Sequence, residues 1–254
     1  MKNDNLTSVL SERSAKNAII TGASSGIGSA IAAMLLRKEW NVYAPARREF
    51  NAPEVSGRLI RIPCDLSDSG SVRSCIRRIL EEADTIDLLV NCAGIGRFGP
   101  HEQMKAEDIS GMVRVNLEAP ILLCALTLRA LKASKGKIIN ISSVTADKDS
   151  VFGCAYAATK AGLSHFSDSL FEEVRKSGVG VTVIQPDLTR TEFYDHLDFE
   201  PDPDPWAAIW PEQVADHVAY VIDTPDNMSV GKITLRPQIN KIRRKTGDAG
   251  KTSH

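Results

Sequence analysis

A tyrosine and a lysine stand four residues apart in the run Tyr156-Ala157-Ala158-Thr159-Lys160. On an α-helix this spacing places both side chains on one face, about one turn apart. A lysine ammonium near a phenol favours the ionised phenol, so a tyrosine with an ordinary pKa of about 10 becomes a usable acid near neutral pH. Asn116 and Ser143 precede the pair and could complete such a site. This set is suited to reducing a carbonyl group.

A glycine-rich segment, Thr21–Gly28, lies far upstream, between an apolar run and a helical pattern. Gly22 permits a tight turn, Gly26 lets the backbone approach a phosphate, and Gly28 allows the helix to pack closely on the strand. The helix start would offer free N–H groups and a positive dipole end to a pyrophosphate. The spacing GxxxGxG differs from the commoner GxGxxG. We expect the segment to bind a nucleotide cofactor through Gly22, Ser24, Ser25, Gly26, Ile27 and Gly28.

Two arginines follow the second apolar run, in Ala46-Arg47-Arg48. Folds that prefer NAD usually place an acidic residue here, where it binds the ribose 2′-hydroxyl. Arginines at this point could instead clamp a 2′-phosphate. The sequence therefore favours NADP(H), with Arg47 ahead of Arg48, and NAD(H) stays possible if both arginines are only surface charges.

The composition is that of an ordinary soluble globular protein, with 43% hydrophobic and 25% charged residues. The 31 basic and 32 acidic residues give a net charge of −1, which does not favour nucleic acid or membrane as a partner. The polar N-terminal segment contains no apolar stretch typical of a signal peptide or membrane anchor, so we expect a cytoplasmic protein. Five scattered cysteines without a histidine cluster predict reduced thiols and no metal site.

Apolar runs alternate with helical patterns along most of the chain. Strands are expected at 18–21, 41–45, 59–62, 86–90, 137–142 and 179–185, and helices at 27–37, 71–82, 109–131 and 156–176. This alternation predicts an α/β fold: a Rossmann-type doubly wound parallel sheet in three layers. We expect residues 1–239 to form a single domain, with the ligand at the carboxyl ends of the strands.

Two later stretches break the pattern. Residues 191–210 hold several prolines and two tryptophans, which suggests a loop or short helices that cover the substrate as a lid. Residues 240–254 are basic and poor in apolar side chains, which predicts a flexible, solvated tail rather than a nucleic-acid-binding arm.

Taken together, these residues resemble the short-chain dehydrogenase/reductase family, in its single-domain branch. The matching motifs follow one another at family spacing: TGASSGIG at 21–28, Cys64-Asp65-Leu66, Asn91-Cys92-Ala93-Gly94, Asn116, Ser143, and Tyr156 with Lys160. A single YxxxK pattern has little value as a motif, whereas this ordered set is highly specific. The resemblance extends from Ala18 to about Thr191.

The resemblance implies the roles of the site residues. Tyr156 would protonate the carbonyl oxygen as hydride arrives from the nicotinamide, and Lys160 would lower the pKa of Tyr156 and hold the ribose hydroxyls. Both residues would also contact the cofactor. Ser143 would bind the substrate oxygen, and Asn116 would organise a water of the proton relay, although an isolated asparagine can also bond only locally. The remaining cofactor contacts would come from Asp65 and Leu66 at the adenine, and from Asn91, Ala93, Gly94, Pro186 and Thr191 near the nicotinamide ribose and ring.

One position has an alternative beside it, and two others depart from the family motifs. Ser142 is an alternative to Ser143 on sequence alone, and the family spacing favours Ser143. Cys92 replaces the second asparagine of the family motif, a change that a small buried side chain should tolerate. Asp187 replaces a family glycine after the sixth strand and adds a side chain beside the expected nicotinamide site.

The substrate is less determined than the chemistry. The catalytic set and the Pro237-Gln238 ending are similar to serine and 3-hydroxy-acid dehydrogenases and to keto-acyl reductases. The acidic side chains of the lid should instead repel carboxylates, which favours a neutral carbonyl or alcohol resting against Phe193, Trp206 or Trp210. Arg97 could still support an acid-binding site.

A non-catalytic NADP-binding sensor is the alternative from another functional class. It is disfavoured because such a protein would be expected to lose part of the catalytic set, which this chain retains. The family resemblance also implies a homodimer or homotetramer.

Overall fold

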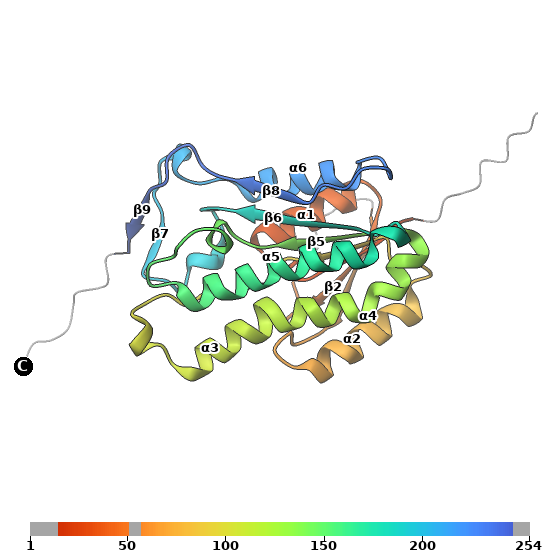
Figure 1. The fold of residues 1–254 in the computed structure, drawn as a ribbon, viewed down its shortest axis with the longest axis horizontal. Helices are drawn as coiled ribbons and strands as arrows, with labels where there is room; N and C mark the ends of the chain where they lie inside the picture. The colour runs from red at the N-terminus through yellow and green to blue at the C-terminus, as the bar shows by residue number, and fades with distance from the viewer. Residues whose placement is uncertain (1–14, 51–56, 246–254) are drawn as a thin grey trace, which may run out of the picture.

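Seven parallel strands form the central sheet of the computed structural model, which describes residues 15–50 and 57–245 (Figure 1). The strands are β1 (Asn17–Ile20), β2 (Asn41–Ala46), β3 (Leu59–Pro63), β4 (Leu88–Asn91), β5 (Lys137–Ile141), β6 (Gly180–Pro186) and β8 (Lys232–Leu235). Their spatial order is β3-β2-β1-β4-β5-β6-β8, so the direction of the chain across the sheet reverses between β1 and β4. This topology confirms the predicted doubly wound fold and predicts a ligand at the carboxyl ends of the strands.

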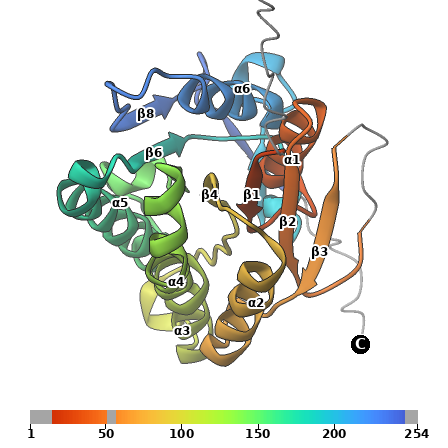
Figure 2. The same cartoon turned by 90° about the vertical axis from the view of Figure 1, so that its right-hand side faces the viewer.

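Helices cover both faces of the sheet and make the three predicted layers (Figure 2). On one face lie α1 (Gly26–Arg37) and α6 (Pro211–Ile222), and on the other lie α2 (Ser69–Glu82), α4 (Ala119–Ser134) and α5 (Cys154–Val174). Strand β1 supplies both cores: Ala18 and Ile20 pack with the α1 side, and Ile19 packs with the α2 side. This alternation follows from the two-residue period of a strand, and it fixes the register of β1 between the layers.

The predicted long helix at 109–131 is interrupted at one point. It consists of α3 (Ala106–Val113), a π-helical turn η2 (Arg114–Glu118) and α4. Asn116 lies in the π turn and is fully buried. Wide turns of this kind occur often at functional sites, and no residue type in this segment predicts one.

The same continuous run, Ala106–Ser134, is the one helix in the described part of the chain that is long and apolar enough to cross a membrane. Core helices of globular domains meet the same criteria. Here the run packs beside α2 and α5 along one face of the sheet (Figure 2).

The region expected to be a lid contains two 3-10 turns, η5 (Glu192–Tyr194) and η6 (Pro205–Ala207), and a short strand β7 (Phe199–Pro201) between them. The remaining 3-10 turns are η1 (His101–Gln103), η3 (Val144–Ala146) and η4 (Arg175–Ser177). Helix α6 follows directly after the lid and was not predicted. Its start at Pro211 suits proline, whose missing N–H costs nothing in a first helical turn.

The expected flexible tail from Asn240 onward requires a correction. Residues Ile242–Arg244 form strand β9, which pairs antiparallel with β7 of the lid (Figure 1). The physical reason is complementary charge, because the basic segment lies against the acidic lid. Residues 246–254 of the expected tail and 1–14 of the expected domain lie outside the described residues.

Candidate active site

A cleft of about 1010 Å³ opens at the carboxyl ends of the strands. Its wall brings together predicted residues from segments far apart in the sequence: Gly22, Ser25, Gly26, Ile27, Gly28, Arg47, Arg48, Ala93, Gly94, Arg97, Ser143, Tyr156, Lys160, Pro186, Thr191 and Phe193. Ser24 lines an adjoining open groove instead. Asp65, Leu66, Asn91, Asn116 and Trp206 do not form part of the cleft wall.

The glycine-rich loop between β1 and α1 has no room for side chains at two of its glycines. Gly22 has a φ of +72°, and a Cβ at Gly28 would lie 2.1 Å from the Gly22 carbonyl oxygen. Ser25 is the N-cap of α1 but makes no side-chain cap hydrogen bond. The first N–H groups of α1 therefore stay available to an anion at the mouth of the cleft.

Tyr156 and Lys160 lie on the cleft side of α5, and both are buried. The Lys160 ammonium donates to the Ile141 carbonyl at 2.9 Å and lies 5.8 Å from the centroid of the Tyr156 ring. Burial lowers the pKa of Lys160 to about 8. Because this lysine remains largely protonated at neutral pH, it can present a positive charge to the cleft.

The pKa of Tyr156 differs from the sequence expectation. Burial raises it above the ordinary range of a phenol, the nearby Tyr194 adds to the rise, and the Ser143 hydroxyl opposes it. Lys160 is not among the groups that shift it. In this structure the phenol is thus a protonated group, ready to donate its proton.

The two adjacent serines after β5 have different surroundings. The Ser142 hydroxyl donates to the Lys160 carbonyl at 2.9 Å and contacts the Ser164 hydroxyl at 2.9 Å. The Ser143 hydroxyl accepts hydrogen bonds from the Thr145 N–H and hydroxyl at the start of η3. The Ser143 hydroxyl also lies beside the Tyr156 hydroxyl, whose pKa it lowers, so its proton is directed to the reacting end of the cleft, where it could donate to a ligand oxygen.

Asn116 holds the loop after β4 rather than facing the cleft. Its Oδ1 accepts from the Ile95 N–H at 2.9 Å, and its Nδ2 donates to the Ile95 carbonyl at 2.8 Å and to the Thr159 hydroxyl at 3.2 Å. Both amide protons are therefore used, and a lone pair of Oδ1 is what remains for a water. A Cβ at Gly94 would lie 3.5 Å from both Asn116 Oδ1 and Lys160 Nζ, so this glycine keeps the loop close to both groups.

Asn91 at the end of β4 connects the centre of the sheet to the helix layer. Its Nδ2 donates to Asn140 Oδ1 at 2.8 Å, and Asn140 in turn donates to the Ser167 hydroxyl at 2.7 Å. Asn91 Oδ1 is buried without a hydrogen-bond partner among the described residues. Asn91 thus supports the end of strand β4 beneath the cleft. Its partner Asn140 was not identified by any sequence motif.

Arg47 and Arg48 are exposed residues that follow β2 at the cleft wall. Asp65 is exposed after β3, and its Oδ1 accepts from the Ser67 N–H and hydroxyl. These hydrogen bonds, more than the nearby Arg47, hold the pKa of Asp65 below its ordinary value. Leu66 packs partly against the core on the α2 side. The positive charges and the carboxylate thus lie at the same end of the sheet.

Aromatic rings surround Tyr156 on its open side. Its ring centroid lies 5.4 Å from that of Phe98 and 5.8 Å from that of Phe193. Phe98 also makes an edge contact with Phe199 at 5.3 Å, and Tyr194 packs against both Phe193 and Phe199. Phe98, Tyr194 and Phe199 were missed in the sequence, because nothing in their local pattern distinguishes a cleft ring from a core ring.

The two tryptophans of the lid do not lie where substrate contacts were expected. Trp206 is 64% exposed and Trp210 is 49% exposed, and neither lines the cleft. The Arg190 guanidinium lies 5.4 Å from the Trp210 ring and donates to the carbonyls of Asp202 and Asp204. Trp210 therefore packs within the lid. Phe193 alone of the three proposed aromatic contacts faces the cleft.

The acidic lid also differs from the uncompensated surface that the sequence suggested. Glu200 pairs with Arg243, and Asp202 pairs with Lys241, both across the β7–β9 pairing. Glu200 and Asp202 are thus compensated, whereas Glu192, Asp195 and Asp198 line the cleft without an ion pair among the described residues. Arg97 lines the cleft but is partly neutralised by Asp108, whose Oδ1 lies 3.2 Å from Arg97 Nε.

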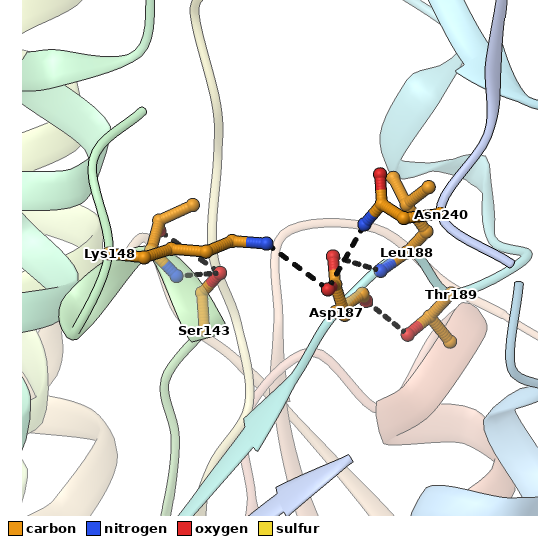
Figure 3. Close-up of polar contacts among 7 residues, drawn as sticks. Ser143, Lys148, Asp187, Leu188, Thr189 and Asn240 are labelled. Carbon is orange, nitrogen blue, oxygen red and sulfur yellow. Dashed lines mark hydrogen bonds and ion pairs between the residues drawn. The ribbon is translucent and has the colours of Figure 1, made fainter. Parts of the chain in front are cut away.

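Asp187 occupies the position where the family has a glycine, directly after β6 (Figure 3). Its side chain is only 9% exposed, and its carboxylate accepts from Lys148 Nζ at 3.3 Å, Asn240 Nδ2 at 3.2 Å and the Leu188 N–H at 2.9 Å. The added charge is therefore fully engaged at the cleft wall and does not point into it as an isolated anion.

The five cysteines are all free: Cys64, Cys75 and Cys124 are buried, Cys92 is half-buried and Cys154 is exposed. Within residues 15–50 and 57–245, no group of three or more histidine, cysteine or acidic side chains could hold a metal ion.

Comparisons with known proteins agree with this geometry. A sequence model of the family described as short chain dehydrogenase matches residues 16–200. An uncharacterized oxidoreductase of Staphylococcus epidermidis is 30% identical over 227 residues, which cover 87% of this chain and 97% of the relative. The 3-oxoacyl-[acyl-carrier-protein] reductase of Escherichia coli is 36% identical over 182 residues, covering 70% of this chain and 75% of the relative.

Among solved structures, a metagenomic short-chain oxidoreductase in complex with NADP superposes with a TM-score of 0.76 at 33% identity. The match covers 88% of this chain and 97% of that protein.

Proposed function

Because this chain belongs to the short-chain dehydrogenase family of oxidoreductases, we propose that it interconverts a carbonyl and an alcohol with NADP(H), using Tyr156 as the general acid and base. The observation that carries this proposal is the shared cleft, in which Ser143, Tyr156 and Lys160 line one wall and the glycine-rich loop lines another. The proton donor Tyr156 and the start of helix α1, which can bind an anion, thus line the same cleft.

The residues present fit a dinucleotide cofactor. A side chain at Gly22 or Gly28 would collide with backbone, so these glycines let the loop, helix α1 and the segment after β4 pack closely beside the cleft. The uncapped N–H groups of α1 suit the pyrophosphate, and Thr191 lies against Gly26 at the other side of the loop. When bound, the nicotinamide supplies or accepts the hydride.

The chain's own groups handle the proton. Ser143 donates a hydrogen bond to the substrate oxygen and orients it towards the Tyr156 hydroxyl. The raised pKa of Tyr156 keeps its proton in place until the oxygen becomes basic, and the proton then moves from the Tyr156 hydroxyl to that oxygen. Lys160 contributes a positive charge that stabilises the phenolate left behind. Asn116 positions the loop at Ile95 and acts through it.

The NADP(H) preference rests on Arg47 and Arg48. Both side chains are exposed at the cleft wall, without an ion pair among the described residues, so both are available to a 2′-phosphate. A neighbouring solved structure holds NADP, which supports the same choice.

Two alternatives are retained. The likeness to the 3-oxoacyl-[acyl-carrier-protein] reductase of Escherichia coli supports a keto-acyl or 3-hydroxy-acid substrate within the same reaction class. A cofactor-binding sensor is disfavoured, since Ser143, Tyr156 and Lys160 are kept together at the cleft. We also expect a cytoplasmic homodimer or homotetramer, as in the sequence-based prediction.

The deciding experiment follows oxidation of NADPH with a panel of aldehydes and ketones. We expect turnover by the native protein and a loss of about a hundredfold or more in kcat for Tyr156→Phe, with cofactor affinity unchanged. Tyr220→Phe is the control, because Tyr220 is an exposed tyrosine on α6, away from the cleft. Cofactor binding without turnover of any carbonyl compound would refute the enzyme proposal and favour the sensor.

A further inference from the structure

The C-terminal segment Asn240–Lys245, called the strap below, forms part of the cleft wall. Asn240, Ile242 and Arg244 line the cleft, whereas Lys241 and Arg243 do not. The family match ends at residue 200, so the strap lies outside the part of the chain that the family resemblance describes.

The strap is held in place by backbone and charge. Strand β9 pairs with β7, in the register Phe199 to Arg244 and Pro201 to Ile242. The Lys245 N–H donates to the Asp198 carbonyl at 2.8 Å, and Lys245 Nζ donates to the carbonyls of Tyr194 and Asp195. Its position against the lid is therefore specified by contacts along its whole length.

The two-residue period of β9 sends alternate side chains to opposite sides. Arg243 turns to Glu200, and its Nε lies 2.6 Å from Glu200 Oε1. Arg244, the next residue, faces the cleft together with its cross-strand neighbour Phe199. A one-residue change of register would exchange the two arginines, so the observed pairing determines which of them can reach a ligand.

Arg244 is the uncompensated cation of the strap. Lys241 and Arg243 each have an acidic partner, and Lys245 is bound by two carbonyls. Within residues 15–50 and 57–245, no carboxylate lies within 4.0 Å of the Arg244 guanidinium, although Asp198 also lines the cleft.

A row of rings leads from Arg244 to the reacting end of the cleft. Phe199, opposite Arg244, contacts Phe98 at 5.3 Å, and Phe98 contacts Tyr156 at 5.4 Å. A flat apolar group lying along these rings would extend from the Tyr156 end of the cleft towards the strap that carries Arg244. Arginine binds carboxylates through paired, charge-assisted hydrogen bonds.

We propose that Arg244 is a specificity-determining residue that binds a carboxylate on the substrate, at the end of an aromatic or apolar group remote from the carbonyl. This inference rests on the proposed function, because it takes Tyr156 as the point where the carbonyl reacts. It departs from the expectation of a neutral substrate, and two of the acidic side chains on which that expectation rests, Glu200 and Asp202, are paired with the strap.

The test measures binding and turnover separately with matched probes. The binding probes are para-hydroxymethyl benzoate and para-methylbenzyl alcohol, together with the corresponding biphenyl pair, which is longer between its two ends. Their affinities for the full chain in the presence of NADP are measured by titration calorimetry. Turnover is measured with the aldehydes that correspond to the same alcohols.

For at least one pair, we expect the carboxylated alcohol to bind about tenfold more tightly than its methyl counterpart. Arg244→Glu should weaken its binding by about tenfold or more and leave the methyl counterpart within about twofold. Arg244→Lys should retain part of the preference. Arg236→Glu is the matched control, because Arg236 is an exposed arginine outside the cleft wall.

Equal weakening of both members of each pair by Arg244→Glu, or no carboxylate preference in the native chain, would overturn the inference. The melting temperature of each variant separates loss of the fold from loss of recognition. Carboxylated probes that bind through Arg244 while no aldehyde is reduced would support the inference and refute the proposed function, so the two can fail independently.

Discussion

The Lys148 ammonium lies 3.3 Å from the Asp187 carboxylate, across the space between the segment that follows β5 and the end of β6 (Figure 3). Asn240 of the strap donates to the same carboxylate. Asp187, the first residue after β6, therefore joins its own segment to two others that are far apart in the sequence: the connection after β5 that carries Ser143, and the C-terminal strap. A glycine at this position could make none of these side-chain contacts.

Replacing Asp187 should loosen these three segments. For Asp187→Gly we expect a loss of about 1–3 kcal/mol in the free energy of unfolding, because the charge-assisted bonds to Lys148 and Asn240 disappear together. Asp187→Asn should lose less, since an amide can still accept from both. Urea unfolding of the full chain measures the difference.

The matched control for Asp187 is Asp223, whose carboxylate pairs with Lys38 but is 62% exposed. Asp223→Asn should change stability by no more than about 0.5 kcal/mol, as expected for an exposed ion pair. A comparable effect of the two substitutions would contradict the connecting role of Asp187.

The activity should decline in alkaline solution because of Lys160. Burial lowers its pKa to about 8, so the ammonium is present below that pH and is lost as the pH rises through it. The pKa of Tyr156 is raised, which keeps the phenol protonated over the same range. The ratio kcat/KM for NADPH, which reports groups of the free enzyme, should therefore fall above about pH 8.

Lys160→Arg distinguishes this assignment from general alkaline damage. A guanidinium stays charged throughout, so any remaining activity of this variant should lack the decline near pH 8. Lys132→Arg, an exchange at an exposed position of α4, should keep the native profile. A decline that is identical in all three proteins would assign it to another group.

Arg47 should set the choice between the two nicotinamide cofactors. Arg47→Ala removes a cation that could bind the 2′-phosphate of NADPH. We therefore expect KM for NADPH to rise about tenfold while KM for NADH, which has no 2′-phosphate, stays nearly constant. Initial rates with each cofactor measure this. Arg37→Ala, at the exposed end of α1, provides the control. A native preference for NADH would refute the assignment.

Asn140 should matter for stability although it does not reach the cleft. It is fully buried, accepts from Asn91 and donates to Ser167. Asn140→Leu removes the oxygen acceptor of Asn91 Nδ2 and a donor to the Ser167 hydroxyl in the core, and should cost about 1–3 kcal/mol in unfolding free energy. Gln238→Ala, at an exposed position, should be close to neutral.

Much of the fold could be predicted from local patterns of apolar and polar residues in the sequence. The strands of the parallel sheet are short apolar runs, and each predicted helix shows a buried stripe, so the expected and observed elements agree within a few residues. The glycine loop and the Tyr156 to Lys160 spacing were recognisable because their chemistry needs fixed spacing. Their common cleft then follows from the topology of the sheet.

The parts that could not be predicted depend on contacts between distant segments. Nothing near Arg243 or Arg244 indicates a strand, because β9 consists of three exposed residues that pair with a lid strand of three residues. The paired state of Glu200 follows from that same contact. The raised pKa of Tyr156 likewise depends on how completely the folded chain buries it.

The π turn at Arg114–Glu118 has a consequence for how this chain tolerates insertions and deletions. A π turn holds one residue more than an α-helical turn, so the extra residue is taken up within the turn and deleting one residue there would restore an unbroken α-helix. Leu123, Cys124 and Leu131 of α4 would then still face the core, whereas a deletion within α4 itself would rotate the residues after it by about 100°. The π turn is thus the place in this helix where the chain could lose one residue at the least cost to packing, although the wide turn that holds Asn116 would be lost.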